Sequence, residues 1–282
     1  MELSIIVTSQ NRPKEFRRLI DSINSQQGFD FHNLQVIFVD QTGGGNRNTF
    51  GLLNTLIVRK YISYHRCGLS EARNQGIPFV NGDIIGFGDD DAWYDATTLS
   101  KIIECFKDEG IDGIGCCIEN ENNKPYANYP KEEKLLTYEN HYGVSSAAMF
   151  LRYDSSIKFD ENIGVGSPYN LMSGEETDYL WTYMEKHPKF KIVFHPEIIV
   201  RHPVGDGRTI SSDNIKKAYS YARGYGYIIH KHLVSLRLRM KAFYRPMLGM
   251  IIYALKNPRR SKRSFMLLKG RLEGYFFKLP KA

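Results

Sequence analysis

The sequence predicts an α/β protein with a mixed, mainly parallel central sheet flanked by helices and a basic, helical C-terminal appendage. Three observations support this prediction. Strand-like and helix-like segments alternate through the first hundred residues, polar and acidic residues follow several of the strands, and positive charge gathers beyond residue 234. The length of 282 residues allows one large domain with an appendage or two small domains.

The alternation is read from hydrophobic patterning. Short β-branched apolar runs predict buried strands, and apolar residues at helical spacing predict helices between them. The strands are expected at 3–7, 34–39, 56–64 and 82–87, and the helices at 13–26 and 70–79. This order predicts parallel pairing of the strands.

The middle of the chain has strand-like pieces at 111–118, 145–152 and 191–194, and the acidic run 174–178 opens a helix that continues to Glu185. Acids at a helix start are also favoured by the helix dipole, so capping is an alternative role for this run. We expect a catalytic domain at 1–205, with a nucleotide-binding half (1–100) and an acceptor half (101–205), followed by a helical, basic region at 206–282.

The four cysteines have no CxxC spacing, and no secretory signal is visible, so we expect free thiols in a cytoplasmic protein. From Ser235 to the end, thirteen Lys and Arg stand against one acid, a net charge of +12, whereas the remainder carries −5. An anionic membrane surface is the favoured partner of this tail, as a peripheral contact on the inner face. A solvated helical face or oligomer contact, or nucleic acid, are the alternatives, and the last is expected least. The apolar run 247–255 is shorter than the roughly 20 residues that a membrane span needs.

Polar residues stand at the ends of three predicted strands: the cluster 8–12, Asp40 and the triplet Asp89, Asp90 and Asp91. Parallel sheets place ligands at the carboxyl ends of their strands. All three groups should therefore face one crevice.

Three consecutive aspartates repel one another unless a cation is near, and Mg²⁺ and Mn²⁺ prefer carboxylate and phosphate oxygens. On an extended segment Asp89 and Asp91 project to one side and Asp90 points away. An isolated triplet of this kind is more often an acidic turn that caps the next helix, here the one after Trp93. Its surroundings favour a metal site.

Six segments together resemble the family 2 glycosyltransferases of the GT-A fold. They match the family in type, order and spacing over about 200 residues: the opening strand and turn Ser4–Pro13, the second strand Val36–Asp40, the helix start Gly68–Gly76, the strand with a DXD motif Gly82–Asp91, a GED-like motif Gly174–Asp178, and the strand end Val200–His202.

The resemblance implies a GT-A nucleotide-diphospho-sugar transferase fold and a nucleoside-diphosphate sugar donor, with a UDP-sugar favoured. It implies that the nucleoside pocket is lined by Thr8, Asn11, Asp40 and Arg73, with Arg12 close by. The donor-binding set also includes Asp89 and Asp90. A divalent metal, Mn²⁺ or Mg²⁺, is expected on Asp91 as the main ligand, with Asp89 and His202; a histidine at a strand end is otherwise more often structural.

The catalytic base of the family's GED motif corresponds to Glu176, where the family usually has Asp. Glutamate is one methylene longer but still takes a proton from an acceptor hydroxyl. Glu175 and Asp178 remain rivals, and Asp178 is expected to orient its neighbours or to cap the helix instead. The implied reaction inverts the sugar and uses a glycan or lipid-linked acceptor, in surface polysaccharide synthesis. A nucleotidyltransferase and an inactive nucleotide- or polyanion-binding module are the alternatives; the absence of a Gly-rich phosphate loop after the first strand disfavours the former.

Overall fold

A computed structural model describes residues 1–141, 144–203, 211–232 and 234–280. Contacts divide the chain into two compact units. The first comprises 1–67, 71–158 and 183–204, and the second comprises 68–70, 159–182 and 205–282. The boundary that the sequence predicts at residue 205 stays a prediction.

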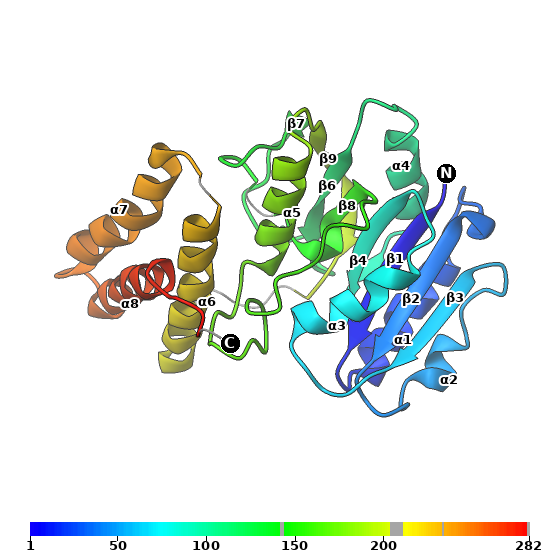
Figure 1. Ribbon diagram of the computed structural model, residues 1–282, viewed down its shortest axis with the longest axis horizontal. Coiled ribbons are helices and arrows are strands. Elements are labelled where there is room, and N and C mark those ends of the chain that lie inside the picture. The colour runs from blue at the N-terminus through cyan, green and yellow to red at the C-terminus, as the bar shows by residue number, and fades with distance from the viewer. Residues whose placement is uncertain (142–143, 204–210, 233, 281–282) are drawn as a thin grey trace. The chain divides into compact units, whose positions relative to one another are not determined.

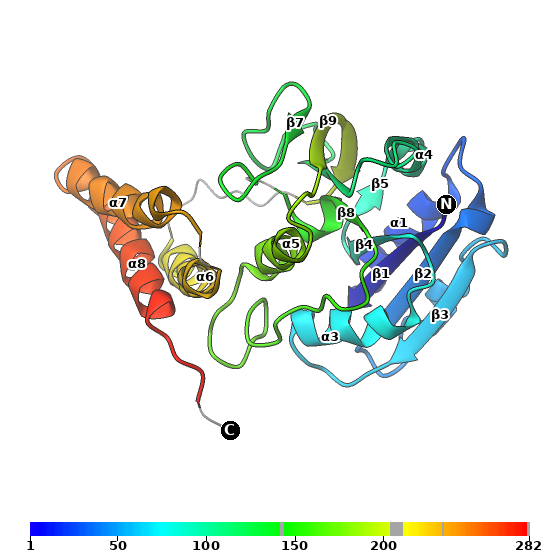
Figure 2. The same ribbon diagram turned by 45° about the horizontal axis from the view of Figure 1, so that its top comes forward.

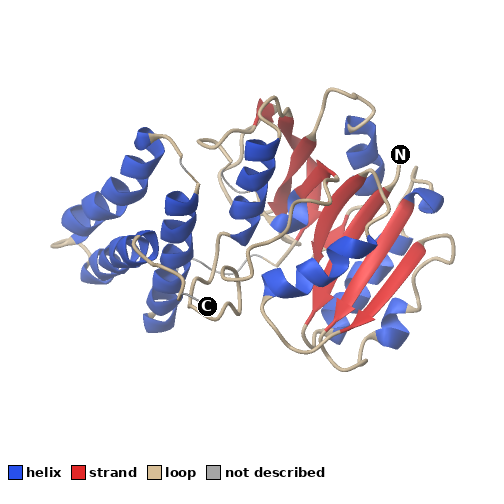
Figure 3. Ribbon diagram, viewed as in Figure 1, coloured by secondary structure: helices blue, strands red, loops and turns tan. Residues whose placement is uncertain are grey.

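The described part of the first unit is built on a nine-stranded sheet (Figures 1 and 3). Its main path follows the order β3, β2, β1, β4, β8, β6, β9, β5, and β7 pairs with β9. The strands are β1 (Leu3–Ser9), β2 (Leu34–Asp40), β3 (Val58–Ser63), β4 (Ile84–Asp89), β5 (Trp93–Tyr94), β6 (Gly113–Glu119), β7 (Lys134–Leu135), β8 (Met149–Arg152) and β9 (Ile192–Arg201).

The pairing is mixed, as predicted: four described pairs are parallel and four are antiparallel, and the parallel pairs are the longer ones. β1 is parallel to β2 and to β4, β2 to β3, and β6 to β9, whereas β5, β7 and β8 pair antiparallel to their neighbours. Every residue of β1 and β2 is buried. Continuous apolar strands of this kind are expected where helices cover both faces of a parallel sheet.

The helices of the first unit supply those covers. They are α1 (Pro13–Asn24), α2 (Arg47–Phe50), α4 (Thr98–Cys105) and most of α3 (Leu69–Gly76), with 3₁₀ turns at Phe31–Asn33, Ile77–Phe79 and Ser146–Ala148. α1 starts at a proline, which suits the first turn of a helix, and Phe16 stacks on Phe38 of β2 with ring centroids 4.2 Å apart. The last residue of α3, Gly76, lies against Ile6 on the opposite face of the sheet. Figure 2 shows the two helices on either side of the strands.

The structure differs from the predicted elements in three places. The segment 145–152 is a strand only from Met149, because a 3₁₀ turn occupies Ser146–Ala148. β9 continues to Arg201 past a register shift between Cys116 and Cys117, where Pro196 interrupts the ladder because it has no N–H to donate. β5 and β7 were not predicted, since two residues are too few to show a period.

The second unit contains the start of α5 (Glu175–Lys186) and the helices α6 (Ser212–Lys231), α7 (Leu236–Tyr253) and α8 (Pro258–Tyr275). Ser211, Ser235 and Asn257 cap α6, α7 and α8 by accepting hydrogen bonds from backbone N–H groups of the first turn. α6 and α8 pack closely at glycines: a Cβ added at Gly274 would lie 1.9 Å from the carbonyl oxygen of Arg223.

All four cysteines are free, as predicted. None of the helices in the described residues has the length and apolar character of a membrane span.

Candidate functional site

Three strand ends of the first unit lie side by side. In the parallel register Ser9 is paired with Asp40, and Thr8 is paired with Asp89. The carboxyl ends of β1, β2 and β4 therefore meet at one edge of the sheet, and the expected convergence of the polar cluster 8–12, Asp40 and the triplet is found there.

The turn after β1 is tied to the triplet. Asn11 has φ 71°, a left-handed conformation that asparagine tolerates better than most residues. Arg12 then reaches Asp90 Oδ1 with its Nη1 at 3.3 Å and forms a second ion pair with Asp91. Ser9 Oγ donates to Asp90 Oδ2 over 2.6 Å. Asp90 is thus held by Ser9 of β1 and shares Arg12 with Asp91.

Asp89 has a separate cation. The fully buried Arg73 of α3 donates from Nη2 to Asp89 Oδ1 at 2.8 Å and to Ser146 Oγ at 2.7 Å. Arg73 therefore lies at the acidic strand end, and its predicted place beside the nucleoside stays a prediction.

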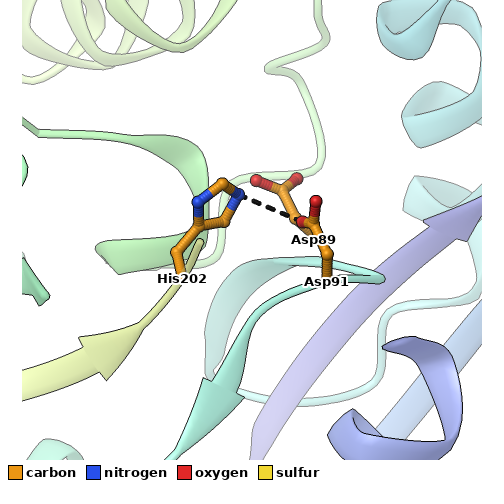
Figure 4. A group of neighbouring side chains, drawn as sticks. All are labelled: Asp89, Asp91 and His202. Carbon is orange, nitrogen blue, oxygen red and sulfur yellow. Dashed lines mark ion pairs between the residues drawn. The ribbon is translucent and has the colours of Figure 1, made fainter. Parts of the chain in front are cut away.

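Asp91 faces His202, which directly follows β9. His202 Nε2 lies 3.0 Å from Asp91 Oδ1 (Figure 4). His202 Nδ1 is 2.9 Å from the carbonyl oxygen of Pro203. Since a carbonyl only accepts, Nδ1 carries a proton, and Nε2 is the nitrogen that points at the carboxylates. In the protonated imidazole Nε2–H donates to Asp91, and in the neutral imidazole the Nε2 lone pair is available to a cation.

The three aspartates do not share one environment. Burial raises the pKa of Asp90 to about 6, despite the hydrogen bond from Ser9 and the charge of Arg12. Burial also acts to raise the pKa of Asp91, but the hydrogen bond and charge of His202, with Arg12, lower it below its ordinary value. Burial opposes the charged form of His202, while its hydrogen bond to Asp91 raises the pKa of the imidazole.

One oxygen each of Asp89 and Asp91 and one nitrogen of His202 lie within 4.8 Å of one another, and all three residues are half-buried. Two carboxylates and an imidazole are a donor set that Mn²⁺ accepts, whereas Mg²⁺ is usually bound through oxygen alone. Without a metal, Arg12, Arg73 and His202 offset the repulsion of the triplet. The residues therefore fit a divalent cation. Arg12, whose side chain is 52% exposed, would compete with that cation for the carboxylate of Asp91.

Asp40 is fully buried and holds its own loop. Its carboxylate accepts hydrogen bonds from the backbone N–H of Thr42 at 2.9 Å, the N–H of Asn46 at 3.3 Å and the hydroxyl of Tyr61 at 2.8 Å. Burial, with the hydrogen bond to Asp40, raises the pKa of Tyr61. A nucleobase would have to replace one of these donors or use a remaining lone pair of Asp40.

The second unit carries the acidic run at the start of α5, after Gly174 with φ 100°. Glu175 is buried, beside Gly164, and Glu176 is half-buried. Asp178 is buried in an ionic network: its Oδ1 lies 2.7 Å from His232 Nε2 and its Oδ2 lies 2.9 Å from Lys231 Nζ. Asp178 therefore ties the start of α5 to the end of α6, and the orienting role expected for it stays a prediction.

A second group in the first unit combines the same residue types. His195 Nδ1 lies 3.1 Å from a carboxylate oxygen of Glu133 and 3.1 Å from one of Glu197. The histidine is buried, but the two glutamates are 62% and 52% exposed. Sequence reasoning did not select this group, because its members follow no strand end of the parallel half.

Two further residues at the triplet were also not selected. Ser9 lies in the polar cluster 8–12 and could have been predicted as a site residue, because it is the last residue of the strand and its side chain points to the face opposite that of Thr8. Ser146 had no signal, because its hydrogen bond to Arg73 joins segments 73 positions apart.

Comparisons with known proteins agree with this geometry. Residues 4–166 match the sequence model of glycosyl transferase family 2. A mannosyltransferase from Pyrobaculum calidifontis, solved with GDP-Man and Mn²⁺, superposes with a TM-score of 0.60 at 14% identity, covering 99% of this chain and 76% of that one. S. aureus TarS 1-349 in complex with UDP-GlcNAc gives a TM-score of 0.58 at 16% identity, covering 99% and 93%.

A sequence relative, protein CgeD of Bacillus subtilis (strain 168), is 28% identical over an alignment of 116 residues, and the match covers 37% of this chain. The matched segment spans 26% of CgeD. Together with the sheet order, the structural likenesses show the GT-A-like α/β fold that the family resemblance implied.

Proposed function

Because the chain belongs to glycosyl transferase family 2, we propose that it transfers a sugar from a nucleoside-diphosphate sugar to a hydroxyl of a glycan or lipid-linked acceptor. A UDP-sugar is the favoured donor, and surface polysaccharide synthesis is the proposed setting. The observation that carries the proposal is the meeting of Asp89, Asp91 and His202 at the end of β4.

We propose that Asp91, Asp89 and His202 hold a divalent cation, with Mn²⁺ preferred to Mg²⁺ because one donor is an imidazole. The cation would offset the charge that grows on the departing diphosphate. The solved mannosyltransferase with GDP-Man and Mn²⁺ supports this choice. Arg12 would be released from Asp91 and lie beside the same phosphates.

For the nucleoside we propose Thr8, Asn11, Asp40 and Arg73. Support comes from the strand ends, which bring Thr8 and Asp40 to the edge that carries the triplet. Asn11, with φ 71°, lies in the turn that directly follows β1 at this edge.

As catalytic base we propose Glu176. It accepts the proton of the acceptor hydroxyl; the oxygen bonds to the anomeric carbon as the bond from that carbon to the diphosphate breaks, and the configuration inverts. The contacts of the second unit support this choice over its neighbours. Glu175 is buried, and Asp178 is engaged by Lys231 and His232, whereas Glu176 is half-buried.

A donor screen tests the reaction class. Release of nucleoside diphosphate is measured with UDP-, GDP- and dTDP-sugars, each with Mn²⁺, with Mg²⁺ and with EDTA. We expect metal-dependent release of one nucleoside diphosphate. Release of pyrophosphate would identify a nucleotidyltransferase, and donor binding without any turnover would identify an inactive binding module.

Substitution of the acids tests the base. Glu176→Gln should bind the donor with unchanged affinity and lose transfer, because the amide cannot accept the proton. Glu175→Gln is the matched control and should transfer at close to the wild-type rate. If Glu175→Gln loses transfer and Glu176→Gln does not, the catalytic base is Glu175. A product that keeps the anomeric configuration of the donor would contradict inversion.

A further inference from the structure

Helix α7 exposes a stripe of large apolar side chains. Leu236 is 73% exposed, Ile251 is 61% exposed and Leu255, just past the helix, is 96% exposed. The stripe on the helix consists of Leu236, Met240, Met247, Leu248, Ile251 and Ile252. Contiguous exposed apolar surface of this kind marks an interaction site more often than scattered single residues do.

The stripe lies on one side of α7. At about 100° per residue its members fall within about 160° of arc, which also contains the basic Arg237 and Lys241 near the start of the helix. The buried Leu238, Ala242 and Pro246 lie on the opposite side. One apolar face of α7 therefore packs inside the second unit, where α7 and α8 form a helical hairpin (Figures 1 and 2). The other apolar face of α7 is exposed, and no described residue of that unit buries it.

Positive charge surrounds the tip of this hairpin. Lys256, Arg259 and Arg260 directly follow Leu255, and Lys262 and Arg263 lie in the next turn of α8. Among the described residues none of these five forms an ion pair with an acid. Between Ser235 and Pro280 the one acid is Glu273, and it is engaged by Lys269, Arg223 and Tyr219.

The apolar and basic residues at this tip could meet a second copy of the chain, nucleic acid or an anionic bilayer, and their chemistry favours one of the three. A second copy of the chain would bring one segment of charge +12 against another, so self-association of this face is opposed by charge. Nucleic acid complements the cations but not the aliphatic side chains beside them. An anionic bilayer complements both, because its phosphates attract the cations and its acyl boundary takes the apolar side chains.

We propose that the tip of the α7–α8 hairpin docks on an anionic membrane surface. Ile251, Ile252 and Leu255 enter the boundary between headgroups and acyl chains, and the five cations of 256–263 contact lipid phosphates. The helices lie at the interface and do not cross it. This inference goes beyond sugar transfer and would hold if the chain transferred no sugar.

Vesicle flotation of the full chain tests the proposal. Phosphatidylcholine vesicles with and without phosphatidylserine are compared at low and high salt. We expect binding only with phosphatidylserine, weakened by salt because screening reduces attraction between exposed charges. Equal binding to neutral vesicles, or none to either kind, would overturn the proposal.

Two variants separate the charges from the apolar tip. Arg259→Gln, Arg260→Gln, Lys262→Gln and Arg263→Gln combined should weaken binding at least about a hundredfold. The control removes the same charge elsewhere, at the exposed Lys101, Lys124, Lys131 and Lys189, each changed to Gln. It should bind like wild type; equal loss in both would mean that net charge, not the tip, is responsible.

Insertion of the hairpin tip into the bilayer is measured by tryptophan fluorescence in the variant Leu255→Trp. Its fluorescence should shift to the blue when phosphatidylserine vesicles are added and not when an oligonucleotide is added. A blue shift that grows with protein concentration without vesicles would instead show self-association. Since donor hydrolysis is measured without vesicles, a failure here and a failure of sugar transfer are distinguishable.

Discussion

Two groups in the first unit each combine two carboxylates with one histidine: Asp89, Asp91 and His202, and Glu133, His195 and Glu197. Both bring their ligand atoms within 4.8 Å of one another. They differ in how the side chains are held. The aspartates are short, half-buried and fixed at a strand end by Arg12 and Arg73, whereas the glutamates are long and mostly exposed around a buried histidine.

The difference teaches that residue type and proximity are not enough for a metal site. Ordering two exposed glutamates costs side-chain entropy that the strand-end aspartates have already lost on folding. The triplet is also held by Arg12 and Arg73, while His195 pairs with carboxylates that water screens. We expect the first group to bind a divalent cation and the second to act as an ordinary ion pair.

The largest effect is expected for Asp91→Ala, which removes the proposed main metal ligand and its contacts with His202 and Arg12. Metal-dependent release of nucleoside diphosphate should fall by at least about a hundredfold. Circular dichroism should show an unchanged fold, because Asp91 lies in a turn at the sheet edge. Wild-type rates in this variant would place the metal elsewhere.

A smaller loss is expected for His202→Ala. The two carboxylates remain, so the Mn²⁺ concentration for half-maximal activity should rise about ten- to a hundredfold while the rate at saturating Mn²⁺ changes less. A titration of activity against Mn²⁺ measures this. A reduced rate with unchanged Mn²⁺ dependence would make His202 a donor contact and not a ligand.

Asp90→Asn should change turnover by no more than a few-fold, since Asp90 is engaged by Ser9 and not by Asp89 or His202. The amide oxygen still accepts from Ser9, and the lost pair with the half-exposed Arg12 contributes less than about 1 kcal/mol to stability. Kinetics and thermal unfolding check both statements. A loss as large as that of Asp91→Ala would show that the whole triplet binds the metal.

The smallest effect is expected for Glu133→Gln combined with Glu197→Gln. Turnover and Mn²⁺ dependence should stay within about twofold, and the unfolding free energy within about 0.5 kcal/mol, as for exposed substitutions. Metal content of the Mn²⁺-loaded protein, measured by elemental analysis, is the direct test. A drop by one equivalent relative to wild type would make the second group a metal site and end the contrast.

The sequence predicted the four strands of the parallel half and the residues at their ends, because buried strands are continuous apolar runs and polar residues stand out where they stop. The family match bears out the recognition that those motifs gave. The sequence did not predict which cation each aspartate contacts. Arg12 with Asp91 and Arg73 with Asp89 join segments that tertiary packing brings together, and no periodicity encodes such pairs. His202 was grouped with Asp91 and Asp89 only through the family resemblance.

The GED-like run also combines a feature that the sequence predicts with contacts that only tertiary packing determines. Its place at a helix start was visible from the acids themselves, but the burial of Glu175 and the engagement of Asp178 by Lys231 and His232 depend on α6, some 50 residues later. The preference for Glu176, first taken from family resemblance, now also has an argument from burial.

The glycines between α6 and α8 reverse a common rule of protein engineering. In an isolated helix, changing Gly274 or Gly226 to alanine would raise helix propensity by about 1 kcal/mol. Here the new methyl group would lie 1.9 Å from the carbonyl oxygen of Arg223 at Gly274, or 2.2 Å from that of Arg271 at Gly226, and would force the two helix backbones apart. Substitutions that raise the helix propensity of α6 or α8 at these glycines would therefore disrupt the packing of the two helices against each other.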